Sequence, residues 1–424
     1  MISPRSALAS AVLAVLLAVC VPASAAAGAG DIGYEGRSTA GDGSAATGEK
    51  PQSKLWWNDG RWWAVLFDTT SQTHHIFRLD RATQQWVDTG TTVDNRPKTR
   101  SDVLWDGTKL YVASHVRASA STGAASGNPA RLYRLSYDPA TQTYSRDLGF
   151  PVAIANYSTE ALTLDNDSTG TLWATWTQGA KVYVNNTVGS DSAWGVPFVP
   201  PVTGANGLDP DDISAVVSFA GRVGIMWSNQ ITSAMFFATH TDGTDRSAWG
   251  VSRTAVQGPH SADDHISLKS LQADPAGRVF AAIKTGLDEA GVTTSAPQIL
   301  MVARDPATGD WTSAPVGRIS DCHTRPIVVI DNANQMLHVF ATAPNSGCPF
   351  TGTPGTIFMK SSPLNQLSFP LGRGTPVLKD ASSANLNNAT STKQTVDATT
   401  GLVVLASNDV TQRYWHADLS LAAA

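Results

Sequence analysis

The sequence predicts an all-β fold, a seven-bladed β-propeller whose last blade is closed by an N-terminal strand. Three observations lead to this prediction. A phrase that begins with Asp and ends with an aromatic residue recurs along the chain, its copies are nearly evenly spaced, and each interval contains short runs with the apolar alternation of β-strands. No segment has sustained helical periodicity, so a solenoid of helices is excluded.

The spacing of the phrase gives the number of blades. Full copies occupy residues 80–86, 138–144 and 305–311, and variants occupy 191–194 and 245–249. The aromatic residues of the series are Trp86, Tyr144, Trp194, Trp249, Trp311 and Phe369. Their steps are 58, 50, 55, 62 and 58 residues, with a mean of about 57. Seven such units account for the 399 residues that follow residue 25 of the 424-residue chain.

Each unit has the plan of a propeller blade. Residues 55–57 and 62–66 are expected to form the first two strands of one blade, joined at Asn58-Asp59-Gly60. Gly adopts positive φ in such a turn at little cost, which favours a hairpin. Residues 103–112 repeat the plan. A third strand follows, as at residues 76–79, and a fourth follows the aromatic phrase, which completes a four-stranded blade.

The two ends of the chain are expected to meet in the last blade. One period beyond Phe369 passes Ala424, so the last blade lacks an outer strand, and one period before Trp86 reaches residues 32–34. An N-terminal strand there would complete the blade and cover two strand edges. Residues 26–50 are therefore expected to hold the closing strand and a linker, flexible over 41–49, and residues 51–424 the propeller.

Residues 1–25 have the pattern of a secretory signal peptide. Arg5 precedes an uncharged apolar run from Ala7 to Val21, and Ala23-Ser24-Ala25 is a small-residue cleavage pattern. The run is too short to span a membrane. Cys20 could instead carry a lipid anchor, although Val19 is bulkier than the residue usual before a lipidated Cys. We expect a secreted, extracellular protein.

Composition and cysteine count argue against a nucleic-acid-binding protein and against a zinc site. Charged residues make up 15% of the chain, the net charge is −5 and there is no Lys/Arg run, so nucleic acid is not an expected partner. Cys322 and Cys348 are expected to form a disulfide closing a loop of about 26 residues, worth roughly 3–4 kcal/mol; two free thiols are the alternative. Neither Cys lies in a C-x-x-C pair, which disfavours zinc.

Polar residues at the starts of the first strands are expected to converge. In a propeller these strands line the central channel, so their starts meet at one mouth. Each of the seven predicted starts contains a charge. They are Ser53-Lys54, Arg100-Ser101-Asp102, Ser158-Thr159-Glu160, Asp211-Asp212-Ile213-Ser214, Asp263-Asp264-His265, His323-Thr324-Arg325 and Ser391-Thr392-Lys393. We expect one site here; a network of charges that only neutralise one another is the alternative.

The residue types at this mouth suit chemistry on a glycan. Imidazoles and carboxylates can act as acid, base or nucleophile, so the catalytic candidates are His265, His323, Asp102, Glu160, Asp212 and Asp264. Cationic groups can hold a ligand carboxylate, so the substrate-binding candidates are Lys54, Arg100, Lys269, Arg325 and Lys393. His74-His75 is expected at the surface. No cofactor is expected; residues 165–170 could hold calcium but favour a plain turn.

Two segments resemble a known family. Residues 184–197 and 241–249, which contain Asp191-Ser-Ala-Trp194 and Asp245-Arg-Ser-Ala-Trp249, are similar to the outer half of sialidase blades with their Asp-box, in a shortened form. The whole pattern resembles secreted actinobacterial propeller proteins. Sialidases have six blades and an arginine triad, whereas this chain counts seven blades and has only Arg100 and Arg325 at strand starts. Seven-bladed polysaccharide lyases, which use His or Tyr and basic residues against a uronate, are the closer analogue.

The leading hypothesis is therefore a secreted propeller that cleaves a glycan, either acidic or neutral, at the channel mouth, as a polysaccharide lyase or a glycoside hydrolase. A lectin-like propeller, with several equivalent sites between blades, is the second hypothesis. A protein-interaction scaffold is the third. The expected partner is a carbohydrate, and the protein is expected to be a monomer without a membrane span.

Overall fold

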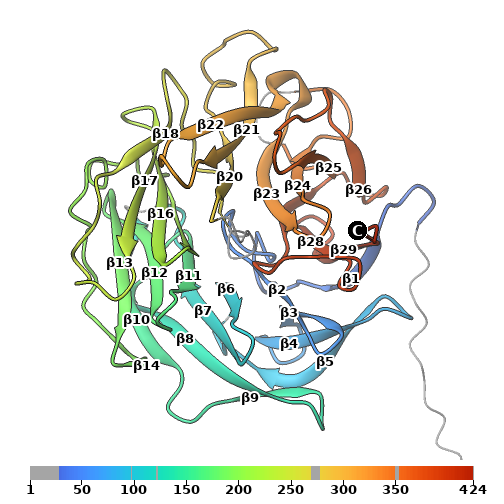
Figure 1. Ribbon diagram of the computed structural model, residues 1–424. Helices are drawn as coiled ribbons and strands as arrows, with labels where there is room; N and C mark the ends of the chain where they lie inside the picture. Colours follow the sequence, from blue (N-terminus) through green and yellow to red (C-terminus); the bar gives the residue numbers. More distant parts are fainter. Residues whose placement is uncertain (1–27, 97, 121–122, 269–276, 349–352, 424) are drawn as a thin grey trace, which may run out of the picture.

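The computed structural model describes residues 28–96, 98–120, 123–268, 277–348 and 353–423. Seven antiparallel sheets are arranged in a ring around a central axis, which confirms the predicted seven-bladed β-propeller (Figure 1). The first strand of each blade lies innermost and the later strands follow outward. Among the described residues, no helix is both long and apolar enough to cross a membrane.

The blades follow one another along the chain. Blade 1 contains β2 (Leu55–Asn58), β3 (Arg61–Asp68), β4 (Thr73–Asp80) and β5 (Gln85–Thr92). Blade 2 contains β6 (Thr99–Trp105), β7 (Lys109–Val116), β8 (Ser126–Asp138), β9 (Thr143–Arg146) and β10 (Val152–Tyr157). Blade 3 contains β11 (Leu162–Asn166), β12 (Leu172–Gln178), β13 (Lys181–Val188) and β14 (Ser190–Trp194). Blade 4 contains β15 (Ser214–Phe219), β16 (Arg222–Asn229), β17 (Ala234–Thr241) and β18 (Arg253–Gln257).

The remaining blades complete the ring. Blade 5 contains β19 (Ile266–Ser267), β20 (Val279–Lys284), β21 (Pro297–Arg304) and β22 (Trp311–Arg318), and the 3-10 helix η3 (Ile319–Asp321) follows it. Blade 6 contains β23 (Thr324–Asp331), β24 (Met336–Ala343), β25 (Thr356–Pro363) and β26 (Thr375–Leu378). Blade 7 contains β27 (Leu386–Thr390), β28 (Leu402–Asn408), β29 (Arg413–Leu419) and β1 (Tyr34–Ser38).

The N-terminal strand closes the ring as the sequence predicts. β1 pairs antiparallel with β29, with Tyr34 opposite His416, and forms the outer strand of blade 7. Figure 1 shows blue β1 beside red β29. Because the first and last strands of the ring share one sheet, this pairing covers an edge that β29 would otherwise expose.

Large aromatic side chains fill the space between and within blades. The tryptophans that are almost completely buried are Trp56, Trp62, Trp63, Trp176, Trp227 and Trp415. The Trp56 indole N–H donates to the Tyr144 hydroxyl of the next blade at 2.8 Å, so a buried polar atom also has its partner. The aromatic residue of the recurring phrase is thus a contact that joins neighbouring blades.

Side chains of the inner strands also join the blades around the channel. The Asp102 carboxylate accepts backbone N–H groups from Ser53 at 2.7 Å and from Leu164 at 2.8 Å, on the blades before and after its own. Asp165 accepts the N–H of Ser218 at 2.7 Å in the same manner. Backbone donors on the inner edge of a blade would otherwise be buried without a partner. These carboxylates therefore hold the ring together.

The segment between β1 and β2 is not the flexible connector that the sequence suggested. We call residues 39–54 the mouth segment. Asp42, Ala46 and Thr47 are completely buried. The Thr47 hydroxyl donates to the carbonyl of Asn388 at 2.6 Å, and the Ala45 N–H donates to the Asp409 carboxylate at 3.3 Å, both in blade 7. The segment therefore lies across the start of the channel. Its small polar residues have the composition of a linker, and the partners that bury them are distant in sequence.

The expected surface position of His74-His75 is also wrong. The two residues are 2% and 8% exposed. Nε2 of His74 lies 3.2 Å from Oδ1 of Asp42 on the mouth segment. Nδ1 of His75 lies 2.9 Å from the Asp88 carboxylate on β5. Both histidines are buried because β4 lies between β3 and β5 in its sheet and the mouth segment contacts its start.

The predicted disulfide is present between Cys322 and Cys348. Cys322 directly follows η3 and the bond spans 26 positions of the sequence, linking the start of β23 to the loop between β24 and β25. Cross-linking lowers the entropy of the unfolded chain, so its effect depends mainly on this separation.

Removal of the disulfide is expected to destabilise the protein. Replacing both Cys322 and Cys348 by Ser should lower the free energy of unfolding by about 3–4 kcal/mol, measured by denaturant titration. Full reduction of the native protein should give the same value, which is the control for local packing. An unchanged free energy of unfolding in both samples would contradict the prediction.

Candidate active site at the channel mouth

A group of charged side chains lies at the start of the channel. We call it the mouth cluster; its members are Lys50, Glu160, Asp211, Asp263, Asp264, His265, Lys284 and Arg325. Lys50 comes from the mouth segment, Glu160 precedes β11 and His265 precedes β19. Lys284 ends β20, and Arg325 lies near the start of β23. The ring therefore brings together residues that are up to 275 positions apart in the sequence.

His265 is held by carboxylates on one nitrogen only. Nδ1 contacts the carboxylate of Asp263 and lies 2.6 Å from Oδ1 of Asp264. Nε2 is buried and has no hydrogen-bond partner among the described residues. Lys284 donates to the other oxygen of Asp263 at 2.5 Å, which fixes that carboxylate. An imidazole whose Nδ1–H is held by a carboxylate presents Nε2 as a proton acceptor.

The charge state of His265 follows from its surroundings. Burial, together with the nearby cations Lys50 and Arg325, lowers the pKa of His265 to about 4, although Asp263 acts in the opposite direction. The imidazole is therefore neutral at pH 7. Asp263 has a pKa well below its ordinary value because His265 and Lys284 outweigh the effect of burial, so it is ionised.

Lys50 links the mouth segment to two carboxylates. Its ammonium group lies 3.1 Å from Oε1 of Glu160 and contacts Asp264. The second oxygen of Glu160 is buried without a partner among the described residues. Burial raises the pKa of Glu160 above its ordinary value, although Lys50 acts in the opposite direction. A carboxyl group with a raised pKa keeps its proton closer to neutral pH than a solvated one, so it can serve as a general acid there.

Arg325 reaches the mouth through an irregular strand start. Its φ is 50°, in the left-handed region, and the pairing of β23 with β24 shifts register between Thr324 and Ile327. Such a bulge changes the direction of a side chain, and strained backbone is common at functional sites. Arg325 is partly exposed, and its Nε has no partner among the described residues. It is thus a cation available to a ligand.

Other predicted basic residues bind the protein itself. Arg100 is 2% exposed, and donates to Oδ1 of Asp42 at 3.1 Å and to the carbonyl of Ser44 on the mouth segment. Lys54 is completely buried, and burial lowers its pKa to about 8, although Asp42 acts in the opposite direction. These two side chains hold the mouth segment in place. Lys269 lies outside the described residues.

Lys393 and Asp102 form a separate ion pair inside the channel. Lys393 Nζ lies 2.6 Å from the Asp102 carboxylate and also contacts the carbonyl of Leu164. Lys393 follows β27 instead of preceding it, so the predicted strand start at residues 391–393 is wrong.

The two remaining catalytic candidates bind groups of the fold. Asp212 accepts the N–H of Asp209 at 2.7 Å and that of Gln230 at 3.2 Å, which stabilises two turns. His323 is buried beside the disulfide, and its Nε2–H donates to the carbonyl of Arg373 at 3.0 Å. Of the predicted catalytic residues, the structure therefore brings together His265, Asp264 and Glu160.

Sequence reasoning gave no role to three residues that shape the mouth. Asp42 and Lys50 lie in a Gly- and Ser-rich stretch that has the composition of a linker. Lys284 ends a strand, where a lone Lys is usually solvated. For a fourth residue, Asp263, the sequence does carry a signal, because it stands in the run Asp263-Asp264-His265.

Several groups of carboxylates and imidazoles have spacing that could hold a metal ion. Two share Asp264 at the mouth: Asp263 with His265, and Glu160 with Asp211. The ammonium group of Lys50 contacts the shared Asp264, and that of Lys284 lies against Asp263 of the first group. In the loop at residues 165–170, the carboxylates of Asp165 and Asp167 accept hydrogen bonds from Ser218 and Thr169, so they are engaged in the fold.

Four buried histidines give a prediction for acid stability. Burial lowers the pKa of His115 and His416 to about 3, and that of His265 and His323 to about 4. The unfolded chain binds more protons between pH 6.5 and these values, so the free energy of unfolding should fall as pH falls through this window. Unfolding followed from pH 7.5 to 4.5 measures it. His416→Gln should flatten the slope, and a pH-independent stability would contradict the prediction.

No protein-family model matches the sequence, and no curated protein matches it. Solved structures do share the fold. A PL25 ulvan lyase has a TM-score of 0.53 and 11% identity, over 91% of this chain and 96% of that one. The polysaccharide lyase Uly1 has a TM-score of 0.50 and 10% identity, over 92% and 100%. The microbial sialidase Hz136 has a TM-score of 0.45 and 11% identity, over 76% and 66%.

The neighbours in structure include polysaccharide lyases and sialidases. At these identities the likeness concerns the fold alone, since one fold carries many activities. The function has to be argued from the mouth cluster.

Proposed function

We propose that the protein is a secreted polysaccharide lyase that cleaves an acidic glycan at the mouth cluster by β-elimination. One observation carries the proposal: carboxylates hold Nδ1 of His265, its buried Nε2 has no partner among the described residues, and the available cation Arg325 lies near it. A base and a cation are the two groups that this reaction requires.

The reaction would use these groups in one step. Neutral Nε2 of His265 takes the proton from the carbon that bears the uronate carboxylate. The electron pair left behind forms a carbon–carbon double bond, and the glycosidic C–O bond on the neighbouring carbon breaks. The leaving oxygen takes a proton from solvent, and the imidazolium returns its proton to solvent. Water is not added, so the products together have the mass of the substrate.

Arg325 would neutralise the carboxylate beside the proton that is removed. A guanidinium binds a carboxylate through two parallel hydrogen bonds, and it stays charged at all relevant pH values. Neutralising that carboxylate makes the neighbouring proton more acidic, so a weak base suffices. Lys284 and Asp263 act as positioning residues, because they fix the imidazole and do not reach the substrate in this scheme.

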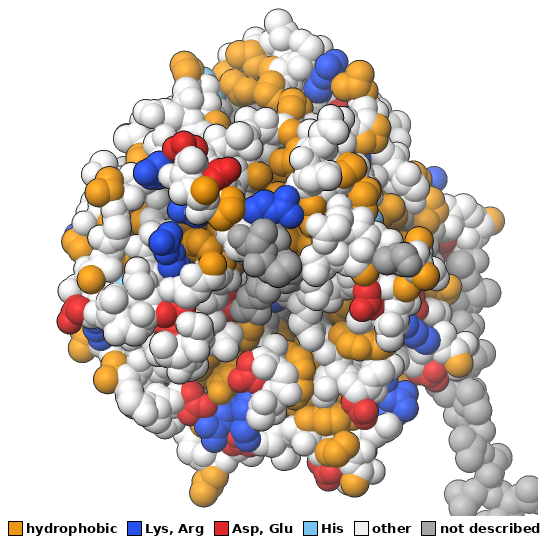
Figure 2. Space-filling model, in the orientation of Figure 1, with side chains coloured by type: hydrophobic (Ala, Val, Ile, Leu, Met, Phe, Trp, Pro, Cys, Tyr) orange, Lys and Arg blue, Asp and Glu red, His pale blue; other side chains and the backbone are white. Residues whose placement is uncertain are grey.

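The surroundings of the cluster agree with a glycan ligand. Asp211 is exposed and Arg325 is partly exposed, so the cluster reaches the surface. On the face in Figure 2, Lys and Arg side chains stand among Asp, Glu and uncharged side chains. The signal-like residues 1–25 and the Asp-box-like segments belong to the same proposal, an exported sialidase-like propeller acting on polysaccharide.

The test is incubation of the full chain with uronate-containing and neutral polysaccharides. The expected result is an unsaturated product, detected by ultraviolet absorbance, from a uronate substrate only, with product masses that sum to the substrate mass. Products that contain an added water would reject elimination. Binding without any product would reject an enzyme.

A hydrolase is the second candidate, because Glu160 has a raised pKa and lies close to Asp264. Oxygens of the two carboxyl groups lie within 4.8 Å of one another, a short separation that is typical of retaining glycosidases. The same assay separates the two candidates through the added water.

A lectin-like role has less support. It predicts equivalent sites between blades, whereas the grooves differ. A groove of about 560 Å³ beside blades 1 and 2 is lined by Arg131 and Tyr133, and another of about 400 Å³ beside β1 is lined by Glu35 and Arg413. Tyr133 is buried, so its ring is not free to stack on a sugar.

A further inference from the structure

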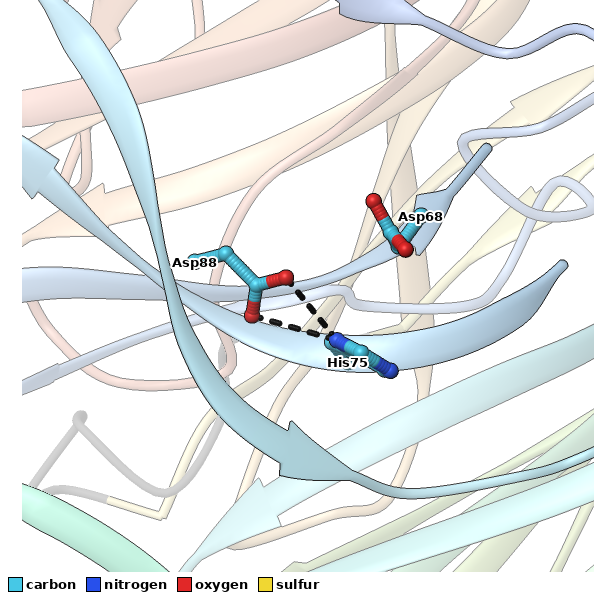
Figure 3. A group of neighbouring side chains, drawn as sticks. All are labelled: Asp68, His75 and Asp88. Carbon is cyan, nitrogen blue, oxygen red and sulfur yellow. Dashed lines mark hydrogen bonds and ion pairs between the residues drawn. The ribbon is translucent and has the colours of Figure 1, made fainter. Parts of the chain in front are cut away.

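A second group of reactive side chains lies in blade 1, away from the mouth cluster. Nδ1 of His75 on β4 lies 2.9 and 3.1 Å from the two carboxylate oxygens of Asp88 on β5. Figure 3 shows these two bonds, with Asp68 nearby and not bonded to His75. On the other side of the ring, Nε2 lies 3.2 Å from the hydroxyl of Ser71. Carboxylate, imidazole and hydroxyl thus form a continuous chain.

Irregular backbone in β5 and in the turn before β4 brings Asp88, His75 and Ser71 together. β4 and β5 shift register between His75 and Phe77, and the extra residues of β5 place Asp88 against the imidazole. The Gly90 N–H donates to Oδ1 of Asp88 at 2.8 Å and fixes the carboxylate. Ser71 lies in the turn between β3 and β4, and the next residue, Gln72, has a φ of 58°. Bulges and left-handed non-glycine residues are frequent beside active sites.

The three side chains differ in exposure: the imidazole is buried, whereas the hydroxyl that would act as the nucleophile is exposed. His75 is 8% exposed and the Asp88 side chain 27%, whereas Ser71 is exposed. The base is therefore sheltered and oriented, and the hydroxyl is open to a substrate. A hydroxyl within hydrogen-bond reach of an imidazole that is itself oriented by a carboxylate is the arrangement of an activated nucleophile.

We propose that Ser71, His75 and Asp88 form a second catalytic site, a serine esterase site in blade 1 that acts on a short carboxylic ester. The Ser71 Oγ attacks the ester carbonyl carbon while Nε2 of His75 takes its proton. The bond to the alcohol breaks, and the alcohol leaves with the proton from His75. Water, deprotonated by His75, then attacks the acyl-serine, which releases the carboxylic acid and restores the Ser71 hydroxyl.

Neighbouring groups define the substrate class. The Ser71 N–H donates to Asp68 at 2.7 Å, so it does not serve the oxyanion. Arg37 is paired with the same carboxylate at 3.1 Å and is the cation that can face the developing charge. Arg37 and Thr69 line the groove of about 400 Å³ beside β1, whose other charged residues are Glu35 and Arg413. A polar groove next to an exposed serine suits a small acyl group on a polar alcohol, such as an O-acyl sugar.

Two other hydroxyls share the imidazole. Thr73 Oγ1 lies 2.9 Å and Thr92 Oγ1 lies 3.3 Å from Nε2, and Thr73 also lies 2.7 Å from Ser71 Oγ. Nε2 accepts one of these protons at a time. Ser71 is assigned as the nucleophile because it is exposed and its hydroxyl is primary, whereas the threonine hydroxyls are secondary.

The test uses the full chain and a fluorophosphonate probe, which labels activated serines, followed by peptide mapping and by assay of p-nitrophenyl acetate hydrolysis. We expect the label on Ser71 and its loss in Ser71→Ala. His75→Gln should lower the labelling rate about 100-fold or more. Asp88→Asn should lower it less and shift the pH dependence of labelling. Ser190→Ala is the matched control, because Ser190 is exposed and bonds only a hydroxyl, that of Ser192.

Three outcomes would overturn the proposal: no label on Ser71 in the native protein, equal labelling in native protein and His75→Gln, or equal labelling of Ser190 and Ser71. A group with a structural role alone would change thermal unfolding in the variants without any labelling of the native protein. The result is independent of lyase activity at the mouth cluster, so either proposal can fail without the other.

Discussion

His265→Ala is expected to lower kcat/KM on the uronate substrate by about 10²–10⁴-fold, the range attributed to a general base. The variant removes the only imidazole of the mouth cluster, and the remaining carboxylates Asp263 and Asp264 are engaged by Lys284 and Lys50. The expected loss is in kcat, since Arg325 and the remaining charges still bind the glycan. Steady-state kinetics by ultraviolet absorbance measure it.

His260→Ala is the matched control for this experiment. His260 is exposed and stands five residues before His265, so the same substitution there should leave kcat and KM unchanged. Asp263→Asn tests the positioning role: it should lower kcat and move the acid limb of the pH–rate profile, because the pKa of His265 depends on that charge. Full activity of His265→Ala would show that another group removes the proton.

Arg100→Met is expected to lower the free energy of unfolding by about 3–5 kcal/mol, the usual effect of breaking a buried ion pair from one side. The substitution removes the ion pair and hydrogen bond that Arg100 gives the completely buried Asp42 carboxylate, and it removes the hydrogen bond that holds the carbonyl of Ser44. Denaturant unfolding at pH 7 measures the change. The mouth segment should become accessible to limited proteolysis in the same variant.

Arg253→Met is the control for Arg100→Met. Arg253 pairs with Asp310 at 2.9 Å, and both side chains are more than half exposed, so its loss should cost less than about 1 kcal/mol. If Arg100→Met were as stable as the native protein but had a raised KM for the glycan, Arg100 would be a substrate-binding residue, as its position at a strand start first suggested.

Features of the fold that depend on residues close together in the sequence, or on the repeat, could be predicted from the sequence. The turn at Asn58-Asp59-Gly60, the aromatic residue that ends each phrase and the pairing of β1 with β29 were all predictable. The turn and the aromatic residues have their sequence pattern within one blade, and the pairing of β1 with β29 follows from the repeat period of about 57 residues. The disulfide was predictable because the sequence after residue 25 contains only two cysteines, Cys322 and Cys348.

The site was predictable in part. His265, Asp264, Glu160 and Arg325 stand at strand starts, and the ring brings such starts together. Lys393 was misplaced, because the inner strand of blade 7 ends at Thr390, before this residue. Lys50 and Asp42 were missed because burial of a Gly- and Ser-rich segment depends on partners in other blades, such as Glu160 for Lys50 and Arg100 for Asp42.

The sequence by itself determined the number of blades and the closure of the ring, because the spacing of a repeat reveals its period and each blade folds on local apolar alternation. Of the polar residues at the mouth, it predicted only a part. Only the tertiary structure decided which of these charges face a ligand. Arg100 and Lys393 neutralise buried carboxylates of the protein, while Arg325 has no such partner among the described residues. A charged side chain can bind a ligand only if no carboxylate of the protein already neutralises it. Which carboxylates lie near it depends on contacts across the whole ring.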